Sequence, residues 1–309
     1  MYSLEVNNLS KSFNKLKAVD NISFAVPEGS VFGLIGRNGA GKTTTIRMMM
    51  NIYIPDSGDV LLRGVKVGQD FKDNAGYLPE ERGLYKKMKI WDTLIYFAEL
   101  KGKSGSEIEK RAIQYLKKFD LYDRKNSKVE DLSKGNQQKI QFITTILHDP
   151  EFLILDEPFA GLDPVNTDLL KDIILELKSR GKVIILSTHL MDFAERLCDH
   201  IALIDKGKIL LHGSLDEIKN NYAKNNVILS CSGNIDFLNN SELIDTIIDK
   251  GNEKSIKLND PDDAGRLLKL LVEKGIQVKK FIAGEISLHE IFIEVTGNGS
   301  SSNKEVANV

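Results

Sequence analysis

Short apolar runs alternate with stretches of helical periodicity from Leu4 to about Tyr222. Continuous apolar runs of four or five residues are typical of parallel strands that helices cover on both faces. Together with the helical stretches between them, they predict an α/β fold with a largely buried parallel sheet. The candidate strands are Val31 to Ile35, Phe152 to Leu155, Val183 to Ser187 and Ile201 to Ile204.

Between Trp91 and Asp131 the pattern becomes helical. Ser106 and Glu109 have the spacing of a capping box, which predicts a helix start at this point. We therefore expect a helical insert in the α/β domain, over about residues 85–145. Its apolar residues recur at helical spacing, at Ile108, Ala112, Tyr115, Leu116 and Phe119.

After Asn220 the pattern changes again, which predicts a first domain over residues 1–222 and a small α+β domain over 223–296. A helix from about Asp262 to Lys274 is expected to turn Leu267, Leu268, Leu270 and Leu271 toward a core. Residues 297–309 are rich in Ser, Gly and Asn, so a disordered tail is expected there. The short strands around the helix are Val227 to Ser230, Ile256 to Leu258 and Val278 to Ile282.

Composition narrows the possible partners. The 42 Lys and Arg against 44 Asp and Glu give a formal charge of -2, so no global positive field would gather nucleic acid, and no nucleic-acid partner is expected. Cys198 and Cys231 are too few for a disulfide framework, which fits a reducing compartment. The N-terminus lacks the features of a secretory signal, and the apolar runs are far shorter than the ~20 residues that cross a bilayer. Any membrane role is expected to depend on a partner.

A phosphate-binding loop is indicated by GRNGAGKT at Gly36 to Thr43, between a predicted strand and a predicted helix. The glycines permit a loop whose N–H groups turn inward, and the helix presents its positive end to a phosphate. Lys42 would neutralise the β and γ phosphates, and Thr43 would place a hydroxyl on Mg²⁺. The candidate nucleotide-binding residues are Gly36, Arg37, Asn38, Gly39, Ala40, Gly41, Lys42, Thr43 and the following Thr44.

A second motif, FLILDEP at Phe152 to Pro158, brings two carboxylates to the C-terminal end of an apolar strand, where ligands sit in open α/β sheets. Asp156 is placed to hold Mg²⁺ through water. Glu157 can project toward the γ phosphate as the base for an attacking water. Alone, the motif would favour a surface turn before Pro158, but the phosphate-binding loop makes the catalytic interpretation stronger.

A phosphate-binding loop by itself could belong to a kinase, a GTPase or a helicase. The discriminating feature is LSKGNQ at Leu132 to Gln137, ahead of the helical run Gln138 to Leu147. It resembles the signature of the ABC ATPases, usually written LSGGQ, with Lys134 and Asn136 in place of the usual Gly and Gln. The resemblance implies that Ser133, Gly135 and Asn136 complete the ATP site of an opposite subunit.

Further matches agree with this family. His189 resembles its switch histidine, which contacts the γ phosphate and positions the lytic water, and AGLD at Ala160 to Asp163 resembles the loop that crosses the dimer interface. Phe13 stands where the family stacks an aromatic ring on adenine, although a Phe there could equally be a core residue. Glu80, in GYLPEERGLY, replaces the usual Gln, and a carboxylate there can still reach Mg²⁺.

The resemblance covers roughly Leu4 to Tyr222 and implies the ATP-hydrolysing subunit of an ABC transporter, with ATP and Mg²⁺ as cofactors. It also implies an ATP-dependent dimer with itself or a similar chain, a transmembrane permease subunit as partner, and a cytoplasmic position on the inner face of the membrane. GYLPEERGLY and the C-terminal SLHEIFIEVTG resemble a branch of bacterial export ATPases that includes a sodium-efflux subunit, so export is the favoured direction.

Two alternatives stay open at this point. A soluble ABC ATPase of translation or DNA repair would share the core chemistry, but such proteins usually carry two cassettes or a long coiled coil, and neither pattern is present. A nucleotide-sensing module without catalysis is disfavoured by the presence of both Glu157 and His189.

Overall fold

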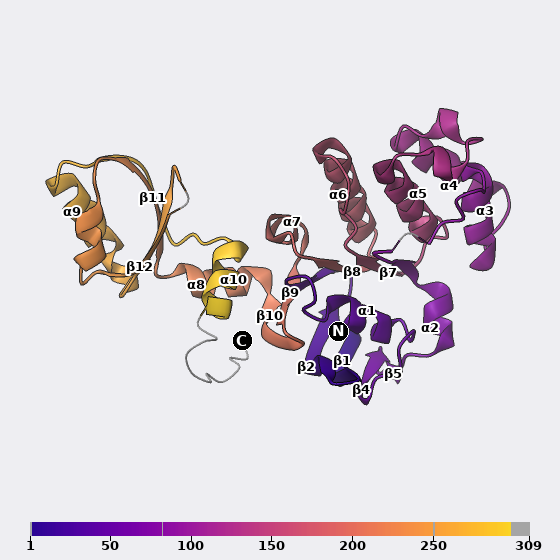
Figure 1. The fold of residues 1–309 in the computed structure, drawn as a ribbon, viewed down its shortest axis with the longest axis horizontal. Coiled ribbons are helices and arrows are strands. Elements are labelled where there is room, and N and C mark those ends of the chain that lie inside the picture. Colours follow the sequence, from indigo (N-terminus) through magenta and orange to yellow (C-terminus); the bar gives the residue numbers. More distant parts are fainter. Residues whose placement is uncertain (1, 82, 250, 298–309) are drawn as a thin grey trace. The chain divides into compact units, whose positions relative to one another are not determined.

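The computed structural model describes residues 2–81, 83–249 and 251–297, and the chain divides into two compact units, Met1–His212 and Gly213–Val309 (Figure 1). The division precedes the predicted boundary at residue 222. The reason is that α8 (Leu215–Ala223) contacts α10 (Leu288–Gly297) and belongs with the second unit.

The centre of the first unit is a six-stranded sheet with the order β10-β9-β3-β8-β7-β6. The pairs β9/β3, β3/β8, β8/β7 and β7/β6 are parallel, and every residue of β3, β7 and β8 is buried. The predicted buried parallel sheet is therefore confirmed. Its strands are β10 (Lys208–Ser214), β9 (His200–Asp205), β3 (Val31–Ile35), β8 (Val183–Thr188), β7 (Phe152–Asp156) and β6 (Gly76–Leu78).

A second sheet, which the sequence analysis does not predict, has four strands in the order β2-β1-β4-β5. Antiparallel β1 and β2 contain several register shifts, which interrupt a regular alternation of apolar and polar residues. The strands are β1 (Tyr2–Phe13), β2 (Leu16–Pro27), β4 (Ser57–Leu62) and β5 (Val65–Lys66).

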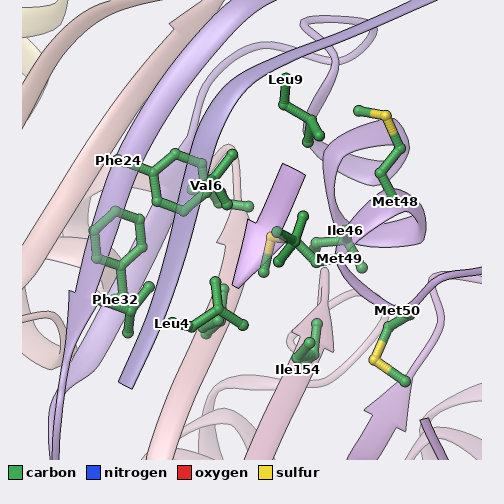
Figure 2. Close-up of a cluster of buried hydrophobic side chains, with 14 of the residues drawn as sticks. Leu4, Val6, Leu9, Phe24, Phe32, Ile46, Met48, Met49, Met50 and Ile154 are labelled. Carbon is green, nitrogen blue, oxygen red and sulfur yellow. The ribbon is translucent and has the colours of Figure 1, made fainter. Parts of the chain in front are cut away.

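One hydrophobic core joins the two sheets and holds helix α1 (Lys42–Met49) in place. Figure 2 shows Leu4 of β1 and Phe24 of β2 in the same cluster as Met49 of α1 and Ile154 of β7. Helices α6 (Pro164–Ser179) and α7 (Met191–Leu197) lie on the other face of the six-stranded sheet (Figure 1). A short α2 (Gln69–Asn74) precedes β6.

The predicted helical insert is confirmed, with three α-helices: α3 (Ile90–Leu100), α4 (Ser106–Lys118) and α5 (Lys134–Ile146). Short 3-10 helices lie between α4 and α5, at Tyr122–Arg124 and Val129–Asp131. The predicted capping box at Ser106 is wrong. Gly105, with φ 92°, is the N-cap and makes no side-chain hydrogen bond, so Ser106 is already inside the helix. Helix α5 begins at Lys134, earlier than the predicted run from Gln138.

The second unit is an antiparallel sheet, ordered β12-β13-β11-β14, with the predicted helix as α9 (Ala264–Glu273). Leu267 and Leu271 are buried as expected, but Leu268 is 36% exposed because it lies about 100° around the helix from Leu267. Gly297 ends α10, and the rest of the predicted tail lies outside the described residues. The strands are β11 (Asn226–Ser232), β12 (Ile244–Asp249), β13 (Lys254–Leu258) and β14 (Gln277–Ala283), and 3-10 helices span Asp236–Asn240 and Pro261–Asp263.

Candidate active site

The predicted phosphate-binding loop connects β3 to α1, and its backbone depends on glycine at defined positions. Gly39 and Gly41 have φ values of 79° and 109°, in the region that favours glycine. A Cβ at Gly41 would lie 2.5 Å from the carbonyl oxygen of Ala18, and one at Gly36 would lie 2.1 Å from that of Ile204. Side chains at these two positions are therefore incompatible with the loop.

A cavity of about 560 Å³ opens over this loop. Helix α1 starts at the cavity and has no acidic residue in its first turn, so its positive end is not neutralised locally. A helix N-terminus of this kind favours an anion such as a phosphate. The predicted site residues that line the cavity are Phe13, Asn38, Gly39, Ala40, Gly41, Lys42, Thr43, Thr44, Glu80 and Glu157.

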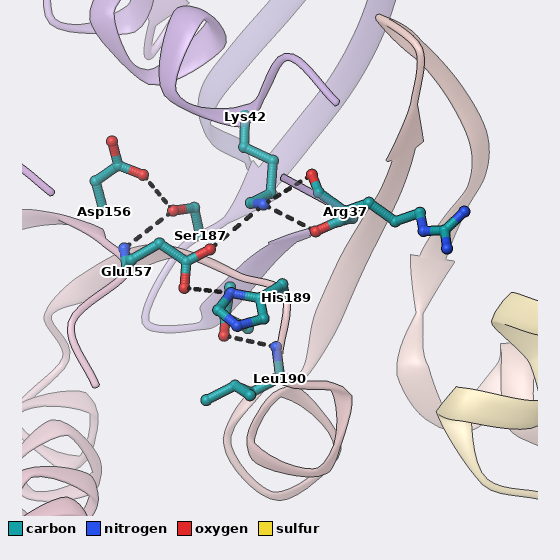
Figure 3. Close-up of polar contacts among 9 residues, drawn as sticks. Arg37, Lys42, Asp156, Glu157, Ser187, His189 and Leu190 are labelled. Atoms are coloured by element: carbon teal, nitrogen blue, oxygen red, sulfur yellow. Dashed lines mark hydrogen bonds and ion pairs between the residues drawn. The ribbon is translucent and has the colours of Figure 1, made fainter. Parts of the chain in front are cut away.

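Lys42 is only 5% exposed, so its charge needs partners inside the protein. Its Nζ donates hydrogen bonds to the carbonyl oxygens of Gly36, at 2.8 Å, and Arg37, at 3.2 Å. The same Nζ lies 3.3 Å from Oε1 of Glu157 (Figure 3). The ammonium group is thus fixed at the boundary between the loop and the carboxylates of β7.

Glu157 has φ 49°, a left-handed conformation that costs a non-glycine residue about 1–2 kcal/mol. Its backbone N–H donates a hydrogen bond to Oγ of Ser187 at 3.1 Å and lies 3.2 Å from the carbonyl oxygen of the same residue. On the other side of the carboxylate, Oε2 is 3.0 Å from Nδ1 of His189 (Figure 3). The backbone turn therefore places this carboxylate between a cation and an imidazole.

Asp156 is fully buried beside Glu157. Burial raises the pKa of its carboxyl group, the neighbouring hydroxyl groups of Ser187 and Thr43 act in the opposite direction, and the charge of Glu157 raises the pKa further. Ser187 Oγ donates to Oδ1 of Asp156 (Figure 3). Among the described residues, no hydrogen-bond partner exists for Oδ2.

These oxygens fit a magnesium ion. Oδ2 of Asp156 is a buried acceptor without a donor, and the hydroxyl of Thr43 supplies a second oxygen of the type that Mg²⁺ prefers. The described residues contain no cluster of three or more His, Cys, Asp or Glu side chains suited to a metal. Mg²⁺ usually binds one or two protein groups together with substrate phosphates and water.

The predicted signature residues lie elsewhere. Ser133 caps α5, and its hydroxyl accepts a hydrogen bond from the backbone N–H of Asn136 at 3.3 Å. A Cβ on Gly135 would lie 3.2 Å from the carbonyl oxygen of Gly161, so the signature lies next to the AGLD loop. None of Ser133, Gly135 and Asn136 is among the described residues that line the cavity. The structure therefore separates the predicted site into two groups.

Phe13 is 40% exposed at the mouth of the cavity, which excludes its interpretation as a core residue. Its ring makes an edge contact with Tyr53, with ring centroids 5.5 Å apart. The structure is therefore compatible with a base that stacks on one face of the Phe13 ring. Contact with adenine stays a prediction.

Two features of the site were missed by the sequence analysis. Ser187 lies in the predicted strand, and its polar side chain in an apolar run was the available signal. The turn Lys206–Gly207 also lines the cavity, with the N–H of Gly207 donating to the carbonyl oxygen of Ala40 at 2.9 Å. Its signal was the glycine in DKGK between two apolar segments, a common turn pattern.

Comparison with known proteins identifies the two units. Residues 19–160 match the ABC transporter family, and residues 213–296 match the C-terminal domain of proteins like the ATP-binding protein DrrA1-3. The chain is 43% identical over 294 residues to YhaQ of Bacillus subtilis, described as an uncharacterized ABC transporter ATP-binding protein, covering 95% of this chain and 98% of that one.

Two other similarities agree. The Nod factor export ATP-binding protein I of Cupriavidus metallidurans is 35% identical over 218 residues, 70% of this chain and 72% of that one. A solved structure described as the ATP-binding subunit of an ABC transporter has a TM-score of 0.67 at 33% identity, covering 71% of this chain and 92% of that one.

Within the described part of the chain, no helix has the length and apolar character needed to span a membrane. The similarity to YhaQ extends over nearly the whole of both chains, and the phosphate-binding loop and Glu157 line one cavity. The chain belongs to the ATP-binding subunits of ABC transporters, the ATP-hydrolysing members of these transport systems.

Proposed function

We propose that this chain hydrolyses Mg-ATP with Glu157 as the general base and drives export by a separate membrane permease. The observation that carries the proposal is the position of the Glu157 carboxylate, at the cavity wall between Nζ of Lys42 and Nδ1 of His189. A carboxylate fixed by an imidazole can take a proton from a water that is directed at the γ phosphate.

Each neighbouring group has a distinct part in this scheme. Lys42 and the N–H groups at the start of α1 neutralise the phosphates, and His189 orients the base and contacts the γ phosphate. Thr43 and Asp156 hold Mg²⁺, which supplies charge neutralisation at the phosphates when bound. Glu80 lines the same cavity and is positioned to respond to the γ phosphate and its metal.

The complete ATP site requires a second chain. Helix α5 has no acidic residue in its first turn, and Ser133, Gly135 and Asn136 lie outside the cavity of their own chain. This leaves a second helix N-terminus for the triphosphate bound to a partner subunit. ATP then closes a dimer of this chain with itself or a similar chain, and hydrolysis opens it.

An apolar groove of about 240 Å³ supports coupling to a membrane permease. It joins the end of α1 to the helical insert, with Met50, Ile52, Leu84 and Phe97 in its walls. A groove of this composition suits an amphipathic helix. Its lining includes His148, whose pKa burial lowers to about 4, so the imidazole adds no positive charge at neutral pH.

The groove and the ATP cavity share one loop. Glu80 lines the ATP cavity, whereas Pro79 and Leu84 line the groove. Gln141 of α5 fixes this loop by donating from Nε2 to the carbonyl oxygens of Pro79, at 3.2 Å, and Glu81, at 3.1 Å. A movement of Glu80 on hydrolysis is therefore transmitted to a helix in the groove.

The export direction and the position at the inner face of the membrane rest on relatives. One similar protein is described as a Nod factor export ATP-binding protein, and the second unit matches a DrrA-like C-terminal domain. That unit is an accessory domain.

The decisive variant is Glu157→Gln, which keeps the shape of the side chain but removes the base. Turnover is expected to fall ~10²-fold or more, the usual scale for a lost general base, while ATP binding is retained. Phosphate release measures the first and a fluorescent ATP analogue the second. Glu81→Gln is the matched control, because the Glu81 side chain is 84% exposed and forms a surface ion pair with Arg47 in the described part of the chain.

The same variant tests the dimer and the permease. With saturating Mg-ATP, Glu157→Gln is expected to form a dimer in light scattering, and a tagged form is expected to bring a polytopic membrane protein with it. Turnover within tenfold of the parent excludes Glu157 as base. A chain that stays monomeric both alone and with its membrane partner contradicts the two-chain site, and recovery with ribosomes contradicts the transport role.

A further inference from the structure

Ser187 carries a buried hydroxyl near the end of a strand whose first four residues are apolar. It lies on β8 after Val183, Ile184, Ile185 and Leu186, all of them buried, and is itself fully buried. The parallel register of β7 and β8 pairs Ser187 directly with Asp156. A buried hydroxyl destabilises the fold unless it is hydrogen-bonded, so its hydrogen-bond partners decide its effect.

The hydroxyl group donates one hydrogen bond and accepts another, and its two partners are Asp156 and Glu157. Oγ donates its proton to Oδ1 of Asp156 and accepts the backbone N–H of Glu157 at 3.1 Å (Figure 3). The carbonyl oxygen of Ser187 lies 3.2 Å from the same N–H. One residue therefore connects the carboxylate assigned to the metal with the backbone of the assigned base.

These bonds have separate consequences for the two carboxylates. Because Oδ1 of Asp156 is engaged by Ser187, the rotation of the carboxyl group is fixed and Oδ2 is left without a hydrogen-bond partner. Because the N–H of Glu157 is held, the residue keeps φ 49°, which directs its carboxylate to Lys42 and His189. Neither consequence requires Ser187 to touch a ligand.

We propose that Ser187 is a positioning residue for hydrolysis, with one hydroxyl that presents Oδ2 of Asp156 to the metal and holds Glu157 in its left-handed conformation. The proposal rests on the proposed function, in which Asp156 binds Mg²⁺ and Glu157 is the base. This role differs from packing. A residue that only fills space between strands would affect the stability of the fold but not its affinity for the metal.

The test compares Ser187→Ala with Ser187→Thr, which keeps the hydroxyl on a side chain suited to a strand. Mn²⁺ replaces Mg²⁺ as a spectroscopic probe, and its binding is titrated by electron paramagnetic resonance in the presence of a non-hydrolysable ATP analogue. For Ser187→Ala, Mn²⁺ affinity and kcat are each expected to fall at least about 10-fold, the range for loss of a group that orients a metal ligand. Nucleotide affinity without metal is expected to stay at the parent value, and Ser187→Thr is expected to recover both losses to within about threefold.

Ser30→Ala is the matched control. Ser30 is also a buried serine with a hydrogen-bonded hydroxyl, donated to the carbonyl oxygen of Pro27 at 2.7 Å, but it precedes β3 at the end of the sheet away from the loop. It is expected to keep parental Mn²⁺ affinity and turnover. Circular dichroism checks folding. If Ser187→Ala does not fold, Ser187→Cys, with its weaker donor, takes its place and is expected to bind Mn²⁺ less tightly than Ser187→Thr.

Parental Mn²⁺ affinity in a folded Ser187→Ala or Ser187→Cys overturns the proposal, and so does a loss that Ser187→Thr fails to recover. Failure of the proposed function gives a different result. In that case the parent chain itself shows no turnover that depends on Glu157, whereas the Mn²⁺ titration still reports whether Ser187 positions Asp156.

Discussion

Helices α1 and α5 begin in similar ways but use their N-termini differently. Neither has an acidic residue in its first turn, unlike α4, with Glu107 and Glu109, or α8, with Asp216 and Glu217. Helix α1 has glycine as its N-cap and no side-chain cap, and its first residue is the buried Lys42. Helix α5 is capped by its own Ser133, and its first residue, Lys134, is exposed.

The difference indicates how the two proposed anion sites contribute to ATP binding. At α1 the loop, the buried ammonium and the carboxylates of β7 form a preorganised pocket within one chain. At α5 the donor groups are partly satisfied by Ser133, which can turn to a phosphate only at the modest cost of one capping bond. We therefore expect variants at α1 to affect ATP binding to a single chain. Variants at α5 should leave that binding unchanged and affect turnover through events that need two chains, apart from any effect on the stability of the helix itself.

The largest effect is expected at α1. Lys42→Ala removes charge-assisted contacts with the phosphates worth about 2–3 kcal/mol, so ATP affinity should fall on the order of 100-fold. Titration with a fluorescent ATP analogue measures it. Lys206→Ala, which removes an exposed lysine from the same cavity, should change affinity less than about threefold, since exposed charges contribute little. Equal effects of the two variants would break the comparison.

An intermediate effect is expected at the cap of α5. Ser133→Ala should leave the ATP affinity of the single chain unchanged, lower the free energy of unfolding by about 1 kcal/mol and reduce turnover about tenfold. Urea unfolding and phosphate release measure the two losses. Ser106→Ala is the control, because Ser106 is in the first turn of α4 but makes no capping bond, and its effect on stability should be below about 0.5 kcal/mol. A weaker ATP affinity in Ser133→Ala would show that the two halves are not separate.

The smallest effect is expected from Lys134→Ala. An exposed lysine at the start of α5 should strengthen the anion site by about 0.5 kcal/mol, so turnover should fall about two- to threefold, and less at high salt. Steady-state hydrolysis at two ionic strengths tests this, with exposed Lys110 of α4 as the control position for Lys→Ala. A fall that does not depend on salt would argue against an electrostatic role for Lys134.

Much of the catalytic half of the site could be predicted from sequence because it depends on continuous segments. The buried strands β3, β7 and β8 begin as apolar runs. The loop follows Ile35 directly, Asp156 is the last residue of β7, and Glu157 comes next. Ser187 could not be assigned, because its role depends on the register between β7 and β8, and single-sequence patterns carry no information on which strands pair.

Other errors have causes that a single-sequence pattern does not show. Ser106 and Glu109 had the spacing of a cap, but Gly105, with φ 92°, is the N-cap, one residue before the predicted cap at Ser106. The sheet β2-β1-β4-β5 was missed because register shifts break its alternation, and α8 was assigned to the first unit because its contact with α10 is distant in sequence. Each depends on backbone geometry or on contacts between distant segments.

Because Lys42 forms an ion pair with Glu157, the proposed base and the nucleotide compete for the same ammonium group. The γ phosphate needs the same ammonium group that the carboxylate holds at 3.3 Å, so part of the attraction between Lys42 and ATP is spent on displacing Glu157. Displacement frees the Glu157 carboxylate to accept a hydrogen bond from a water molecule in place of the ammonium group. Binding of ATP would itself release the carboxylate that we propose as the base for its hydrolysis.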